Sequence, residues 1–138
     1  MPSPTLLLVH GLPASGKTTL ARYLARELGW PAVYKDDIKE ILFDTLGWSD
    51  RERSRQLGVA TIEVLYHIVD MQLSAGVSFV AECNFKPELA APKFRAMLAR
   101  SGARAIQVLC EADGAARLRR FIARQRHPGH ADLEISEA

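Results

Sequence analysis

The amino-acid sequence predicts an α/β fold in which helices cover both faces of a parallel sheet. Short apolar runs that suit strands alternate along the chain with longer segments of helical periodicity. A glycine-rich loop joins the first apolar run to the first helix, at the place where such folds bind phosphates. At 138 residues the chain has the size of one domain, so we expect a single domain over residues 1–138.

Four apolar runs are the expected strands. A continuous apolar run without polar alternation is typical of a parallel strand that is buried on both faces. Comparable folds often have five strands, so four indicate either a truncated chain or a tail that orders only in a complex. The expected strands are Thr5–Val9, Pro31–Tyr34, Val77–Ala81 and Ala105–Cys110.

Five segments with helical spacing are the expected helices. Gly29 and Gly102 supply the stops of two of them, and Ser49 with Glu52 forms a capping box for the long third helix. The expected helices are Thr18–Leu28, Asp37–Leu46, Ser49–Ala75, Pro87–Leu98 and Ala115–Gln125. The third helix is expected to bury a stripe made of Leu57, Ala60, Val64, Ile68 and Met71.

The composition excludes several classes of protein. With 48% apolar and 25% charged residues, the chain is neither disordered nor a collagen-like fibre nor a disulfide scaffold. The cysteines, Cys83 and Cys110, lack metal spacing and are expected to be buried thiols of a reducing compartment. No apolar run approaches the roughly 18 residues of a membrane helix, and the first motif leaves no room for a signal peptide. We therefore expect a cytoplasmic protein without a membrane partner.

The segment Gly11–Thr18 matches the phosphate-loop pattern G-x-x-x-x-G-K-[ST] at every fixed position. Its glycines let successive backbone N–H groups turn toward a phosphate, and the following helix adds the positive end of its dipole. Lys17 is expected to reach the β- and γ-phosphates, and Thr18 to offer its hydroxyl to a magnesium ion. A chance glycine-rich turn is the alternative. The expected nucleotide-binding residues are Gly11, Leu12, Pro13, Ala14, Ser15, Gly16, Lys17, Thr18 and Thr19.

Acidic residues follow two of the expected strands. Asp36 and Asp37 come just after the second, where a carboxylate can accept a proton from a hydroxyl nucleophile. We expect Asp36 to be the catalytic base and Asp37 to cap the next helix; the alternative is that both only cap. Glu82 ends the third strand and is expected to help hold magnesium, against the alternative of an exposed charge at the strand end.

Arginines concentrate near the end of the chain. Eight lie between Arg95 and Arg126, although the net charge of the whole chain is only +2. Arg120 and Arg124 are four residues apart on one helical face and could close over the transferred phosphoryl group. We expect an arginine-rich lid near residues 113–130; the alternative is a solvated basic helix face.

Together these motifs resemble the family of small P-loop kinases, which includes the kinase domain of phage polynucleotide kinase, chloramphenicol phosphotransferase and gluconate kinase. The resemblance rests on HGLPASGKTTLARYLA, KDDIKEIL, VSFVAECNF and LCEADGAARLRRFIARQRHPGH, and covers nearly the whole chain. It implies the fold of P-loop nucleoside triphosphate hydrolases, and we expect the sequence to end before the last strand of that fold. It also implies ATP and Mg²⁺ as cofactors.

Carried over by position, the resemblance makes Asp36 the general base and Arg120 and Arg124 the lid pair. Glu82 stands where the family has aspartate. Lys39 stands where polynucleotide kinase has an arginine for the acceptor phosphate, which disfavours an acceptor that carries a phosphate.

Three functions agree with these observations. The first is an ATP-dependent kinase that phosphorylates a hydroxyl of a small molecule. The second is a 5′-hydroxyl polynucleotide kinase, which the arginines favour but the low net charge and 7% aromatic content disfavour. The third is a non-catalytic ATP-binding regulatory module. The remaining histidines, His10, His127 and His130, are expected to be structural rather than ligands of a metal.

Overall fold

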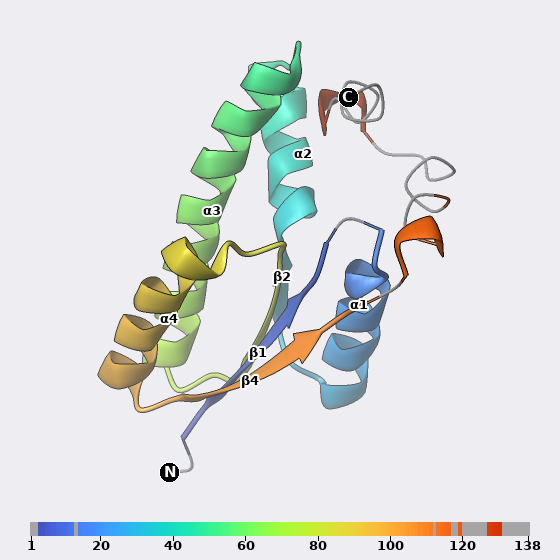
Figure 1. The fold of residues 1–138 in the computed structure, drawn as a ribbon. Helices are drawn as coiled ribbons and strands as arrows, with labels where there is room; N and C mark the ends of the chain where they lie inside the picture. Colours follow the sequence, from blue (N-terminus) through green and yellow to red (C-terminus); the bar gives the residue numbers. More distant parts are fainter. Residues whose placement is uncertain (1–2, 13, 112, 117–118, 120–126, 131–138) are drawn as a thin grey trace.

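Four parallel strands form one sheet in the computed structural model, which describes residues 3–12, 14–111, 113–116, 119 and 127–130 (Figure 1). Their order across the sheet is β2-β3-β1-β4, and each neighbouring pair is parallel. This arrangement confirms the predicted α/β fold of the P-loop type. The strands are β1 (Thr5–His10), β2 (Ala32–Tyr34), β3 (Phe79–Glu82) and β4 (Arg104–Leu109).

Helices cover both faces of this sheet. In Figure 1, α1 lies on one face, whereas α3 and α4 lie on the other. A short 3₁₀ turn, η1 (Pro128–His130), contacts α3. The helices are α1 (Lys17–Leu28), α2 (Lys35–Leu46), α3 (Arg51–Ser74) and α4 (Pro87–Ser101).

The central strand β1 supplies both apolar layers, because its side chains alternate between the two faces. Leu6 and Leu8 join the layer beneath α3 and α4. Leu7 and Val9 join the layer beneath α1, where they meet Ala21 and other small residues. Because β1 lies between β3 and β4, the loop that follows it begins at the carboxyl edge of the sheet, beside the ends of these two strands.

Helix α3 buries Leu57 as expected, but the rest of its buried stripe differs from the expected one. Ala60 is exposed, and Val64 and Met71 are 43% and 53% exposed. The helix carries two neighbouring apolar stripes, and packing against the sheet and α4 selects the one with a residue at every fourth position. Thr61 belongs to this stripe because its hydroxyl donates to the Leu57 carbonyl at 2.7 Å. The buried stripe consists of Leu57, Thr61, Leu65, Val69 and Leu73.

The cap of α3 also differs from the prediction. The Asp50 side chain, and not that of Ser49, accepts a hydrogen bond from the Arg53 N–H at 2.9 Å. The helix begins at Arg51, so Asp50 occupies the extended position that a capping side chain needs.

The expected last helix, Ala115–Gln125, lies mostly outside the described residues, and so do Arg120 and Arg124. A single domain over 1–138 and a lid near 113–130 therefore stay predictions. No helix in the described part of the chain has the length and apolar character needed to cross a membrane.

Candidate active site

The phosphate loop lies between the end of β1 and the start of α1, as the motif predicts. The Ser15 N–H donates to the Leu12 carbonyl at 3.2 Å and closes a tight turn. Gly16 takes the left-handed conformation, with φ of 90°, and precedes α1 without a side-chain cap. The N–H groups of the first helical turn are thus not used by a capping side chain, which suits a bound anion. Pro13 lies outside the described residues.

Gly11 is required by a close approach of the backbone. A Cβ atom there would lie 2.6 Å from the Cys110 carbonyl oxygen and 2.7 Å from Ser15 Oγ. The loop therefore rests directly on the residue that follows β4, and a side chain at position 11 would push the two apart. This contact explains in physical terms why the motif has glycine at its first position.

Glu82 lies at the end of β3, only 3% exposed, which excludes the alternative of an exposed strand-end charge. The Thr18 side chain acts to lower the pKa of Glu82, whereas Glu82 Oε2 has no hydrogen-bond partner among the described residues. Burial raises the pKa of Glu82 to about 7; Lys17 opposes this rise, and Asp36 adds to it. Glu82 is paired in register with Val9 of β1 and with Tyr34 of β2, so it lies beside the start of the phosphate loop and the start of α2. Lys17, Thr18 and Asp36, from these neighbouring segments, all influence its pKa.

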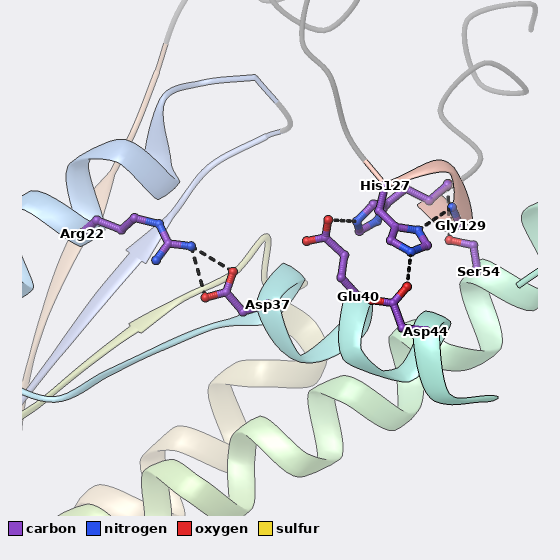
Figure 2. Close-up of polar contacts among 8 residues, drawn as sticks. Arg22, Asp37, Glu40, Asp44, Ser54, His127 and Gly129 are labelled. Atoms are coloured by element: carbon purple, nitrogen blue, oxygen red, sulfur yellow. Dashed lines mark hydrogen bonds and ion pairs between the residues drawn. The ribbon is translucent and has the colours of Figure 1, made fainter. Parts of the chain in front are cut away.

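Asp36 and Asp37 both lie inside the first turn of α2, so the prediction that Asp37 caps the helix is wrong. Tyr34 holds the N-cap position, with no side-chain hydrogen bond, because α2 follows directly on β2. The Asp37 carboxylate instead pairs with Arg22 of α1, with both oxygens contacted at 2.8 and 3.1 Å (Figure 2). Arg22 also lies over the Tyr34 ring, 4.2 Å from its centroid. This pair ties α2 to the helix that follows the phosphate loop.

Two lysines of α2 converge on a glycine of α3, a feature that sequence reasoning missed. A Cβ atom on Gly58 would lie 3.4 Å from Lys39 Nζ and 3.9 Å from Lys35 Nζ. Lys39 is buried, with its ammonium 5.5 Å from the centroid of the Phe43 ring. A glycine inside a helix costs about 1 kcal/mol of stability relative to alanine, so its presence in a helix needs a reason. Gly58 was therefore the sequence signal that another group lies close to the α3 backbone at this position.

The other candidate residues are placed as follows. Thr19 and Leu12 are exposed, and Ala14 adopts a φ of 61°. Within the described ranges, no group of three or more His, Cys, Asp and Glu residues could hold a metal ion. His10 lines an apolar cavity of about 240 Å³ between β4 and α4, where Phe94 and Gln107 are among its neighbours.

Comparison with models of known families shows to which family the chain belongs. Residues 6–138 match the model of the AAA domain family. The chain belongs to this family. No curated protein matches it significantly.

Several solved structures are similar to this AAA-family chain, and some of them are described as kinases. A presumed kinase from Chloroflexus aurantiacus J-10-fl is 40% identical, with a TM-score of 0.91; the match covers 97% of this chain and 78% of that one. A sugar kinase from Janibacter sp. HTCC2649 is 20% identical (TM-score 0.61, 98% and 75% covered). A chain of the Pnkp1/Rnl/Hen1 complex is also 20% identical (TM-score 0.66, 92% and 42% covered). The last two matches show a shared fold alone.

These matches confirm the predicted resemblance to small P-loop kinases. The AAA-family chain therefore has a kinase-like P-loop fold.

The raised pKa of Glu82 leads to a prediction about stability. Its carboxyl ionises near 4.5 without burial and near 7 in the folded protein, so the folded state binds more protons between these values. Stability should fall as pH rises through this window, by on the order of 3 kcal/mol, and stay level above it. Urea unfolding of the metal-free protein should show Glu82→Gln gaining stability over wild type between pH 5 and pH 8. Exposed Glu63→Gln is the matched control; equal behaviour of the two variants would contradict the prediction.

Proposed function

We propose that this protein is an ATP-dependent kinase that transfers the γ-phosphoryl group to a hydroxyl of a small molecule. The observation that carries the proposal is the place of the buried Glu82 between the ends of β1 and β2, where Lys17, Thr18 and Asp36 all act on its carboxyl. These residues come from α1, α2 and β3, so no local sequence constraint forces them together. A cation, a hydroxyl and two carboxylates at such a loop are the groups that phosphoryl transfer uses.

The loop and Lys17 hold the nucleotide in this proposal. The backbone N–H groups of this loop, apart from Pro13, which has none, would surround the phosphates. The Lys17 ammonium would neutralise charge on the β- and γ-phosphates. The first turn of α1 carries no acidic residue, which supports this role because no side chain of that turn repels an anion.

The donor set fits a magnesium ion. Thr18 and Glu82 offer the oxygen ligands that Mg²⁺ prefers, and the buried Oε2 of Glu82 is a carboxylate oxygen with no protein partner in the described part of the chain. Thr18 would hold the ion directly and Glu82 would hold it through water. When bound, the ion would neutralise phosphate charge during transfer.

Asp36 is the proposed general base. It would accept the proton of the acceptor hydroxyl as the oxygen attacks the γ-phosphorus in line with the departing ADP oxygen. Its effect on the pKa of Glu82 supports a place near the phosphate end of the site. Arg120 and Arg124 are proposed to neutralise the transferring group from the lid.

A polynucleotide 5′-hydroxyl is the second candidate acceptor. The arginines of the C-terminal region and the shared fold with a chain of the Pnkp1/Rnl/Hen1 complex favour it. Steep salt dependence of the reaction would identify such an acceptor, because phosphate contacts release counterions. A nucleotide-binding module without transfer remains the third candidate, favoured by tight ATP binding without product.

The decisive experiment measures ADP release with ATP and Mg²⁺ against pooled acceptors. The pools are sugars, nucleosides, aminoglycoside-like alcohols and a 5′-hydroxyl oligonucleotide. One pool should stimulate ADP release well above the rate with water alone, and the phosphorylated product should appear in equal amount. ATP binding without stimulation by any pool would contradict the proposed function for these acceptor classes.

A further inference from the structure

Residues His127–His130 form a tight turn that docks on α2 and α3 (Figure 2). The Gly129 N–H donates to His127 Nδ1 at 2.9 Å, and the His130 N–H donates to the His127 carbonyl at 3.2 Å. Since Nδ1 accepts a hydrogen bond, the proton of the neutral His127 ring is assigned to Nε2. The turn therefore fixes both the tautomer and the direction of the His127 side chain.

On α2 the turn is held by one polar contact and one aromatic contact. His127 Nε2 donates to Asp44 Oδ1 at 2.6 Å. The Phe43 ring lies 5.1 Å from the His127 ring and 5.0 Å from the His130 ring, measured between centroids. A Cβ atom on Gly129 would lie 2.5 Å from atoms of the Phe43 ring. Only glycine at position 129 lets the turn lie this close to α2.

On α3 the same turn is held through its backbone. The His130 carbonyl accepts hydrogen bonds from Arg51 Nη1 at 3.2 Å and from Ser54 Oγ at 3.3 Å. The His130 side chain is only 2% exposed, and its Nε2 lies 3.8 Å from Glu40 Oε1 of α2. Ser54 is fully buried, so this contact has an interior position. A four-residue turn thus joins two helices near the end that is remote from the sheet.

The opposite end of α2 carries the proposed base. Asp36 lies in its first turn, and the neighbouring Asp37 is paired with Arg22 of α1. Helix α2 is therefore held at its start by Arg22 and near its end by the turn, with Lys39 packed against Gly58 between them. Helix α2 has 12 residues and is therefore about 18 Å long. We expect loss of the attachment near its end to change the tilt of the helix, and with it the position of Asp36 in its first turn.

We propose that the His127–His130 turn is a latch that positions Asp36 for phosphoryl transfer by fixing α2 against α3. His127 and Gly129 are then positioning residues, which act on the reaction through α2. The inference rests on the proposed function for its catalytic consequence, whereas the mechanical coupling between latch and helix is independent of it.

The test compares Gly129→Ala and His127→Ala with the wild type. Hydrogen exchange of amides 35–46 should become faster in both variants, because α2 loses its attachment. ADP release should fall about ten- to hundred-fold, since displacing a catalytic group by about 1 Å has effects of this size. ATP affinity, measured by titration calorimetry, should stay within two-fold of the wild type. His127→Gln, which keeps a side-chain N–H donor, should recover part of both losses.

His67→Ala is the matched control, because His67 is an exposed histidine of α3 outside the latch. It should leave exchange and turnover unchanged. If Gly129→Ala does not fold, Asp44→Asn gives a milder test of the same attachment. Unchanged exchange across α2 in folded latch variants would overturn the proposal. A wild type that releases no ADP would overturn the proposed function instead, and the exchange measurement would still decide the latch.

Discussion

Replacing Lys17 with alanine is expected to lower ATP turnover about a hundred- to a thousand-fold while the protein stays folded. Removal of one preorganised charge from a transition state typically has this effect. Lys17 is the cation that acts on Glu82 beside the phosphate loop, and the first turn of α1 holds it there. The measurement is acceptor-dependent ADP release, with circular dichroism to verify the fold.

Lys93→Ala is the matched control for Lys17→Ala, because Lys93 is an exposed lysine in the middle of α4. It should keep full turnover. Near-normal turnover in folded Lys17→Ala protein would show that Lys17 of the phosphate loop takes no part in the reaction. That result would contradict the assignment as a kinase.

The second large effect is expected from Asp36→Asn, which should lower turnover about a hundred- to ten-thousand-fold, the range that general bases supply. Asparagine keeps the shape of the side chain but cannot accept the proton of the acceptor hydroxyl. ATP affinity should change little, because the phosphates are held by the loop. Single-turnover phosphoryl transfer and ATP titration measure the two quantities separately.

Asp37→Asn is the matched control for Asp36→Asn, since it changes the next carboxylate of the same helix. Asp37 pairs with Arg22 at an exposed position, so its loss should cost at most about 1 kcal/mol of stability. Turnover should then fall far less than in Asp36→Asn. A larger loss in Asp37→Asn would exchange the proposed roles of the two aspartates.

The sequence predicted the phosphate loop well because its determinants are local. The glycines, Lys17 and Thr18 occupy fixed positions between one strand and one helix, and the strand and helix periodicity marks both. The expected strands were confirmed for a similar reason, since a parallel strand buried on both faces is a continuous apolar run. Element boundaries moved by only a few residues.

Predictions failed where the answer depends on a distant partner. Asp37 could not be assigned to Arg22 from the sequence, because the two helices meet only in the folded chain. The buried stripe of α3 depends on which of two apolar stripes meets the sheet. His127 and His130 were expected to be structural, but the sequence does not show what they pack against. Their partners are Phe43 and Asp44 of α2 and the Ser54 side chain of α3, which meet the turn only in the folded chain.

The approach of Gly11 to Cys110 has a practical consequence for observing the nucleotide site. Cys83 is fully buried, and burial raises the pKa of its thiol to about 12, which makes it inert to alkylation at neutral pH. Cys110 is partly exposed, although burial also raises the pKa of its thiol. A thiol-reactive dye should therefore label one position selectively. Since the Cys110 backbone contacts the first glycine of the loop, the native chain offers an attachment point for an optical reporter of loop occupancy.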